Sequence, residues 1–286
     1  MRVHPVILSE LRGIIELSDV SAIRSRLEAL MAACTEPSPA VTRSVGPVIL
    51  VDSSAVRDAI EQSDAASLSR ILALTPSVSN FSVDAGTGVT ALHRAVEIRD
   101  VSVVNLLLEQ LESEAHNARS LHNLAGELLM ADLKRKINPQ TAITGYTPLH
   151  FAVSGCHDEV IAELLRRGAD ADCVSLDDQR VSPFLLACEL GQETAVQMMI
   201  KVTRGACADR TDAQGNTGLH LAAENGHSGI AEILMQIVPA LAGYENFDEK
   251  TPVSLARELG FAKIADLIDR MDQQANVEQE PGLFFA

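Results

Sequence analysis

Five stretches of the sequence follow one short pattern, and this repetition limits what the chain can fold into more than any other feature does. The stretches are residues 88–95, 145–152, 180–187, 215–222 and 249–256. The last four end on alanines that stand 35, 35 and 34 residues apart, at Ala152, Ala187, Ala222 and Ala256. A fixed period of this length is typical of units that cannot bury their apolar face alone and fold by stacking on their neighbours.

Each stretch carries the signals of a helix start, and a second helical pattern follows it. A Thr or Ser stands where it can cap free backbone N–H groups. Pro148, Pro183 and Pro252 occupy the first turn, where a missing N–H does no harm. The second pattern is clearest at 159–165, and the stretch at 212–215 has the residues of a tight turn. The sequence therefore predicts an all-α chain of paired short helices joined by hairpins.

The stretch 145–172, GYTPLHFAVSGCHDEVIAELLRRGADAD, resembles the ankyrin repeat, whose signature is T-P-L-H-x-A with a period near 33. The resemblance implies an ankyrin-repeat solenoid of stacked helix-turn-helix units with short hairpin loops. It also implies that partners bind the concave face, which hairpin tips and first helices form. The signature histidines, His93, His150 and His220, would then be structural and bond the backbone of adjacent hairpins. Leu149, Phe184 and Leu219 would point into the core between units.

Some positions depart from the signature. Leu185 and Ser254 stand where the histidine is usual, Ala91 replaces the proline, and Arg99 stands where a glycine is usual. We expect these changes to alter local geometry and to leave the fold intact.

The resemblance divides the chain into three parts. Residues 1–82 are expected to form an N-terminal helical cap of degenerate ankyrin-like units, 83–271 the ankyrin repeats, and 272–286 a flexible acidic tail. A helical insertion is expected at about 111–141, because its apolar residues have helical spacing: Leu121, Leu124, Leu128, Leu129, Leu133 and Ile137. This predicts a lengthened second helix or an extra helix, followed by a loop through 138–139. The insertion either packs on the solenoid edge or protrudes toward a partner.

Charge and cysteine usage exclude several classes of function. The net charge of −16 disfavours binding to nucleic acid and to anionic membranes. No apolar run reaches the ~18 residues of a membrane span, and the first apolar run is too short for a signal peptide. The five cysteines are odd in number, without a C-x-x-C pair, so we expect free thiols in a reducing, cytoplasmic setting.

No sequence motif of an enzyme or of a cofactor site is present. The stacked histidines would lie on the order of 10 Å apart, too far to share one metal ion. We therefore expect no catalysis, no cofactor and no metal, and a monomeric chain whose partner is a protein.

The first candidate partner-binding residues are four glutamates at equivalent repeat positions, which we call a ladder of carboxylates. Glu97, Glu189, Glu224 and Glu258 share one repeat position, two residues after the repeat alanine. Asp178 and Asp248, at hairpin tips, could extend the ladder into an acidic stripe that docks a partner with a basic surface. By the resemblance, further residues occupy exposed positions beside it: Ile143, Tyr146, Val181, Leu190, Asn216, Asn225, Phe247 and Leu259. Tyr146, Leu190 and Phe247 are the expected anchors, since large side chains dominate binding energy.

These observations favour a protein–protein interaction module that binds a partner on the concave face. Three alternatives stay open. The chain could be a secreted bacterial effector that captures a host protein, because Glu278 and Glu280 precede an apolar end. It could be an enzyme subunit with an active site in the N-terminal region or the insertion. It could also be a scaffold that self-associates through exposed edges.

Overall fold

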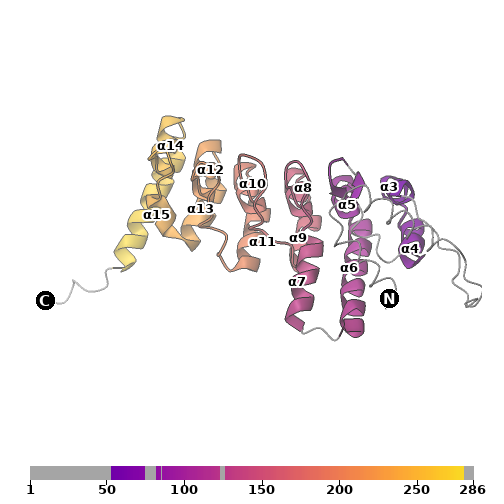
Figure 1. Cartoon of the computed structure of the whole chain (residues 1–286). Helices are drawn as coiled ribbons and strands as arrows, with labels where there is room; N and C mark the ends of the chain where they lie inside the picture. The colour runs from indigo at the N-terminus through magenta and orange to yellow at the C-terminus, as the bar shows by residue number, and fades with distance from the viewer. Residues whose placement is uncertain (1–52, 75–81, 85, 123–125, 280–286) are drawn as a thin grey trace, which may run out of the picture. The chain divides into compact units, whose positions relative to one another are not determined.

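The structure of the chain is a computed structural model that describes residues 53–74, 82–84, 86–122 and 126–279. Over these residues the chain forms helices in pairs (Figure 1). The first helices of the pairs are α3 (Ser53–Glu61), α5 (Ala91–Ile98), α8 (Pro148–Ser154), α10 (Pro183–Glu189), α12 (Gly218–Asn225) and α14 (Pro252–Glu258). The second helices are α4 (Ala65–Leu74), α6 (Val101–His122), α9 (Asp158–Arg166), α11 (Glu193–Thr203), α13 (Ser228–Ile237) and α15 (Ala262–Gln279). The extra helix α7 (Gly126–Ile137) and the 3-10 helix η2 (Pro239–Gly243) stand outside the pairing.

The helix pairs stack in chain order. Each first helix contacts the first helix of the next pair, from α3 through to α14, and each second helix contacts the next second helix, from α4 through to α15 (Figure 1). This arrangement confirms the predicted solenoid of helix-turn-helix units. In the hairpin before α5, β1 (Ser82–Asp84) pairs antiparallel with β2 (Val89–Thr90). We call the segment before each first helix a hairpin tip and the contact between two successive units a joint.

Small and apolar residues at fixed repeat positions form the core. The four repeat alanines are fully buried: Ala152, Ala187, Ala222 and Ala256. Leu149, Phe184 and Leu219 are buried as predicted. Since alanine adds little bulk, neighbouring helices approach closely, and the larger side chains fill the space between units. The core therefore continues from one unit to the next along the described residues.

The signature histidines connect neighbouring units. The Nδ1 atom of His150 accepts the backbone N–H of Thr147 at 3.1 Å, and Nε2 lies 3.1 Å from the Val181 carbonyl oxygen of the next tip. A carbonyl only accepts, so Nε2 carries the proton and Nδ1 is the acceptor. We call such a bond, from a first helix to a carbonyl of the next tip, a clamp. His93 clamps Tyr146 at 2.9 Å in the same way.

A third histidine clamp joins His220 to the Lys250 carbonyl at 3.0 Å. All three signature histidines are therefore structural, as the resemblance implied. Burial lowers the pKa of His93 and His150 to about 4, and it lowers the pKa of His220 as well. The imidazoles are neutral at pH 7, which is the form that can accept at Nδ1 and donate at Nε2.

Backbone bonds also connect each hairpin tip to the next. The N–H groups of four residues at matching positions donate to a carbonyl of the preceding tip at 2.9 to 3.0 Å: Ala142 to Thr87, Leu176 to Thr144, Ala213 to Gln179, and Phe247 to Gln214. Every tip from 82 to 251 is thus held in register with its neighbour, so side chains at equivalent repeat positions line up along one face.

The insertion contains both features that the sequence offered as alternatives. The second helix α6 is lengthened to His122, and α7 is an extra helix that packs along α6. Leu133 and Ile137 are buried as the amphipathic pattern predicts. The side chains of Leu121, Leu124, Leu128 and Leu129 lie outside the described residues. At the end of α7, the Asn138 side-chain oxygen accepts the Asp170 N–H at 2.8 Å, and Lys134 pairs with Asp170 at 2.8 Å. These bonds tie the C-terminal end of the insertion to the α8–α9 unit.

The structure describes only part of each expected end segment. Residues 272–279, expected to belong to a flexible tail, are helical, because α15 extends to Gln279. The helix continues because Ile268 is buried and Met271 packs on the core, and because the residues that follow include good helix formers. Residues 280–286, with the apolar end, lie outside the described residues. Of the expected cap at 1–82, residues 1–52 lie outside them too, while α3 and α4 form a helix pair that packs on α5 and α6.

Candidate protein-binding groove

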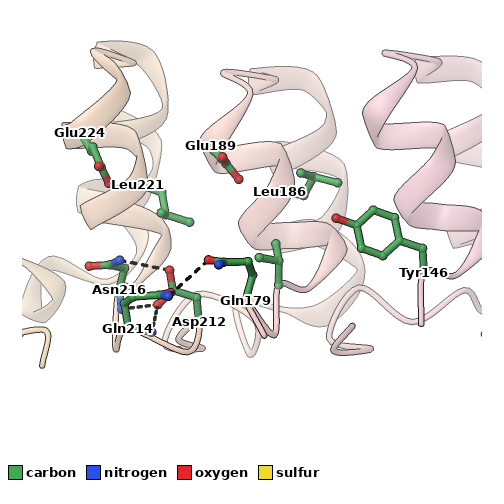
Figure 2. A pocket seen from close by; sticks show the side chains of 10 residues that line it. Tyr146, Gln179, Leu186, Glu189, Asp212, Gln214, Asn216, Leu221 and Glu224 are labelled. Carbon is green, nitrogen blue, oxygen red and sulfur yellow. Dashed lines mark hydrogen bonds between the residues drawn. The ribbon is translucent and has the colours of Figure 1, made fainter. Parts of the chain in front are cut away.

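A groove of about 470 Å³ crosses three consecutive units on the side of the first helices (Figure 2). Its lining comes from the tips and first helices around α8, α10 and α12: Tyr146, Gln179, Val181, Leu186, Glu189, Asp212, Gln214, Asn216, Leu221 and Glu224. Five of these ten residues were singled out from the sequence, which are Tyr146, Val181, Glu189, Asn216 and Glu224. We call this hollow the groove.

The apolar floor of the groove follows from the repeat register. Leu186 and Leu221 each stand one residue before a repeat alanine, so they occupy the same place on α10 and α12. At one end Tyr146 stacks on His150, with ring centroids 4.8 Å apart and planes at 19°. Figure 2 shows the Tyr146 hydroxyl directed toward Leu186. The clamp of His150 thereby also fixes the ring of Tyr146 in the groove.

Hydrogen bonds fix the polar edge of the groove at the tips. Asp212 accepts the backbone N–H groups of Gln214 at 2.9 Å and of Asn216 at 2.8 Å. The Gln214 side chain reaches Gln179 of the preceding tip at 3.3 Å (Figure 2). Asp212 therefore holds the shape of its own hairpin, and the two glutamines present amide groups along the edge.

The lining of the groove is acidic and contains no Lys, Arg or His. Glu189 and Glu224 extend from the ends of α10 and α12 toward the same hollow (Figure 2). Partial burial, followed by repulsion from Glu224 and Asp212, raises the pKa of Glu189. Burial, with repulsion from Asp177 and Glu189, raises the pKa of Tyr146, so its hydroxyl keeps its proton at pH 7. The groove thus offers negative charge, a neutral hydroxyl and an apolar floor.

The four glutamates of the predicted ladder share one repeat position, but only the outer two, Glu97 and Glu258, form ion pairs with described residues. Glu97 pairs with Arg94 at 2.7 Å, and Glu258 pairs with Lys250 at 2.6 Å. Within the described part of the chain, neither Glu189 nor Glu224 has a salt-bridge partner. Lys250 also attracts Glu224 without forming an ion pair with it. The two middle glutamates, which line the groove, therefore differ from the outer two in having no ion pair with a described residue.

Asn216, expected at an exposed position, is buried, with 9% of its surface exposed. Its side-chain amide donates to Asp212 at 3.1 Å, and its oxygen accepts from Asn246 of the next tip at 2.8 Å. These bonds draw the side chain inward, so the prediction of a freely exposed contact residue is wrong here. Val181 is half-buried at the groove wall.

The remaining candidates are exposed and lie outside the groove lining. Asp178, Asp248 and Ile143 stand on hairpin tips, and Leu190 and Leu259 follow α10 and α14. Phe247 is 78% exposed on its tip. Asn225 is exposed, but its side chain donates to the Leu221 carbonyl of its own helix at 2.9 Å. The structure therefore brings Glu189, Glu224, Tyr146, Asn216 and Val181 together and leaves the others outside the lining.

Five groove residues were missed in the sequence: Gln179, Leu186, Asp212, Gln214 and Leu221. Repeat register could have found them. Gln179 and Gln214 are 35 residues apart, as are Leu186 and Leu221. A position that faces the groove in one unit faces it in the next unit as well. A candidate residue in one unit therefore predicts the equivalent residue of the next unit as a second candidate.

Three of the four described cysteines lie in surroundings that disfavour the thiolate. Cys156, Cys173, Cys188 and Cys207 are free thiols, and Cys34 lies outside the described residues. Burial raises the pKa of Cys173, raises that of Cys207 to about 11, and raises that of Cys188 well above its usual range. Protonated thiols are poor nucleophiles. In the ranges that the structure describes, no group of three or more His, Cys, Asp or Glu side chains is placed to hold a metal ion. None of the described helices is long and apolar enough to cross a membrane.

The sequence matches a known family of proteins and several curated relatives. A family model described as ankyrin repeats (3 copies) matches residues 56–174, 115–212 and 163–242. The chain is 29% identical over 153 residues to transient receptor potential cation channel subfamily A member 1 of Drosophila melanogaster, a match that covers 49% of this chain and 12% of that protein. It is 30% identical over 171 residues to the B-cell lymphoma 3 protein homolog of Mus musculus, which covers 59% of this chain and 33% of that protein. The matches thus span a third or less of these curated relatives.

A solved structure shares the fold. It is a chain from the complex of the predatory endopeptidase Bd0816 of Bdellovibrio bacteriovorus with the immunity protein Bd3460. The TM-score is 0.59 at 20% sequence identity, over 76% of this chain and 97% of that one. The family match covers most of the described residues. The signature histidines make the contacts that the resemblance implied. Ankyrin repeats are typically non-catalytic and serve protein–protein interaction. The chain belongs to the ankyrin-repeat family.

Proposed function

We propose that this chain is a non-catalytic binding module that takes up a segment of a partner protein in the groove across α8, α10 and α12. The observation that carries the proposal is a pair of carboxylates, Glu189 and Glu224, that form no ion pair with a described residue and lie above an apolar floor of Leu186 and Leu221. An apolar floor with a few polar groups at its edge is the usual composition of a recognition site. The negative charge favours a partner with a basic surface and speeds its association.

Two further points support a protein as the class of partner. The net charge of −16 repels phosphate backbones. The solved structure that shares the fold comes from a complex between two proteins. The effector and self-assembly alternatives differ in the identity of the partner. For a secreted effector the partner is a host protein, and for self-assembly it is a second copy of this chain.

A capture experiment with a matched charge control tests the proposal. The intact chain is compared with Glu189→Lys plus Glu224→Lys, and with Glu159→Lys plus Glu232→Lys, which makes the same charge change at exposed positions on α9 and α13. Circular dichroism confirms that all three fold. We expect a partner that is retained by the intact chain and the control and is lost by the groove variant.

A photo-crosslinker then locates the contact. A benzoylphenylalanine in place of Gln179, at the groove edge, should crosslink to the captured partner, whereas one in place of Gln197, exposed on α11, should not. Crosslinks at Gln197 alone, or equal retention by all three variants, would move the binding surface away from the groove and contradict the proposal.

A further inference from the structure

The joint between α10 and α12 differs from the other described joints in the way its tip is held. His93, His150 and His220 clamp the joints α5–α8, α8–α10 and α12–α14. At α3–α5 the Arg57 guanidinium donates to the Val83 carbonyl of the next tip, although that carbonyl is not at the equivalent position. At α10–α12 the clamp position holds Leu185, which has no donor, opposite the Asn216 carbonyl. That carbonyl accepts the Asp212 N–H of its own tip at 3.1 Å.

Close apolar packing replaces the clamp at this joint. Gly218 stands in the first turn of α12, where three other units have proline. A Cβ added to Gly218 would lie 2.8 Å from Cys188 Sγ and 3.1 Å from the Phe184 ring. The glycine therefore lets α12 approach α10 closely. The two helices are joined through their buried sides, and within the described residues α10 sends no side-chain bond to the next tip. The side-chain bonds on the groove side of this joint are those of Gln214 to Gln179 and of His227 Nε2 to the Glu189 carbonyl, at 3.3 and 2.9 Å.

The groove side of this joint also concentrates negative charge. Glu189 is the last residue of α10, and Glu224 is the last but one of α12. A helix C-terminus carries partial negative charge, which favours a cation there and disfavours a carboxylate. Partial burial, and after it repulsion from Glu224 and Asp212, raises the pKa of Glu189, so the two carboxylates repel each other across the joint. A cation between them would be stabilised by both carboxylates and both helix ends.

We propose that the groove takes an arginine side chain from an extended segment of the partner, and that its guanidinium bridges Glu189 and Glu224 across the joint that lacks a clamp. The inference rests on the proposed function and names the chemistry of its partner. A guanidinium presents N–H donors on more than one edge in a fixed plane, so it can bond two carboxylates at once, which a compact ammonium does less well. Its flat, weakly hydrated face suits the Leu186–Leu221 floor, and Tyr146 closes the end of the groove.

The test uses a defined probe and the intact chain. The peptide acetyl-Gly-Gly-Arg-Gly-Gly-amide is titrated into isotope-labelled protein, and amide shifts are followed by NMR. Two counterparts are titrated in parallel, one with lysine and one with citrulline, which keeps the shape of arginine and lacks its charge. We expect saturable shifts at the 211–217 tip and the C-terminal ends of α10 and α12. Citrulline should bind about tenfold or more weakly than arginine, and lysine about threefold more weakly.

Matched variants separate this site from general acidity. Glu189→Gln with Glu224→Gln should weaken arginine binding about tenfold, whereas Glu97→Gln with Glu159→Gln should change it less than about twofold. Absence of saturable shifts at millimolar peptide, equal binding of citrulline, or equal loss in both variants would overturn the inference. A partner that crosslinks at Gln179 yet binds Glu189→Gln with Glu224→Gln undiminished would also overturn it, while leaving the proposed function in place.

Discussion

At the joint between α8 and α10, the His150 imidazole bonds the cap residue of its own helix and the Val181 carbonyl of the next tip. At the joint between α10 and α12, Leu185 fills the same repeat position, and Phe184, Cys188 and Gly218 bring the helices into close apolar contact. Both joints have the same backbone bond between tips. One adds a buried polar clamp, and the other adds closer packing and leaves its groove side without a clamp.

In the proposed function, the clamped joints contribute to stability and the α10–α12 joint contributes the recognition site. A buried histidine clamp gives the backbone N–H of its cap residue an acceptor, and it adds a second bond to a tip carbonyl that already accepts a backbone N–H of its own tip. Among the described residues, the α10–α12 joint has no such bond from α10 to the next tip, and the side-chain hydrogen bonds on its groove side come from Gln214 and His227, which reach Gln179 and the Glu189 carbonyl. The four predictions that follow test the two joints against each other, from the largest expected effect to the smallest.

Replacement of Phe184 should have the largest effect, because this ring is fully buried at the joint that depends on packing. Phe184→Ala is expected to lower the free energy of unfolding by about 3–5 kcal/mol, through lost burial and a cavity. Urea denaturation followed by circular dichroism measures this loss. Phe247→Ala, at an exposed ring, is the control and should stay within about 0.5 kcal/mol of the native chain. A similar loss for both variants would show that the α10–α12 joint is not held by this packing.

Removal of a clamp should have the second largest effect. His150→Leu gives the α8–α10 joint the residue that the α10–α12 joint has naturally. It removes the bond to Val181 and leaves the buried Thr147 N–H without its imidazole acceptor. We expect the free energy of unfolding to fall by about 2–3 kcal/mol. His116→Leu, at an exposed histidine on α6, provides the comparison and should change little. If His150→Leu is as stable as the native chain, clamped and unclamped joints are equivalent.

The clamps also predict a dependence of stability on pH. The pKa of His150 is lowered from 6.5 to about 4 in the folded chain. Below pH 6.5 the unfolded chain takes up a proton that the folded chain does not, so stability falls from pH 6.5 toward pH 4 and is fully present above pH 6.5. At pH 5 this histidine should reduce the free energy of unfolding by about 2 kcal/mol.

Denaturation midpoints of the native chain and of His150→Leu, measured at pH 7 and pH 5, isolate this contribution. The variant should lose about 2 kcal/mol less than the native chain over that interval. Parallel losses in the two proteins would mean that the imidazole of His150 is not held neutral in the folded state.

Charge at the middle glutamates of the ladder should have the smallest effect on stability. Glu189→Gln relieves repulsion from Glu224 and Asp212, so it should raise the free energy of unfolding by up to about 0.5 kcal/mol. Glu258→Gln, at the same repeat position, breaks the exposed pair with Lys250 and should change the free energy of unfolding slightly in the opposite direction, by lowering it. Thermal or urea unfolding measures both variants. Changes of opposite sign in the free energy of unfolding would support the difference between the middle and outer glutamates, and changes of the same sign would contradict it.

The fold could be predicted from the sequence because each unit repeats the same local signals. In one unit, the cap, first-turn, clamp and close-packing positions are Thr147, Pro148, His150 and Ala152. Because the sequence repeats, the same local signals recur in the next unit. The end of α15 was harder to place, because the residues after Met271 are mostly polar and carry no clear stop signal before Gln279. The insertion was located, but its two helices could not be told apart from one apolar pattern.

The site could be predicted only in part, because its chemistry depends on contacts between units. The four glutamates share one repeat position, and nothing in that position shows that Arg94 and Lys250 neutralise the outer two. Asn216 was expected to be exposed, but bonds to Asp212 and to the next tip draw it inward. Leu185 was visible as a departure from the signature, whereas its consequence, a joint held by packing around Gly218, appears only when two units are placed together.

Amide hydrogen exchange at the four matched tip residues tests the central claim most directly. Ala142, Leu176, Ala213 and Phe247 make the same backbone bond to the preceding tip, and among these described joints only that of Ala213 lacks a clamp. We predict that Ala213 exchanges about tenfold faster than the other three, as expected for one missing hydrogen bond, and that the arginine peptide slows Ala213 selectively. Equal exchange at all four amides, or protection by the peptide at all of them alike, would contradict the account.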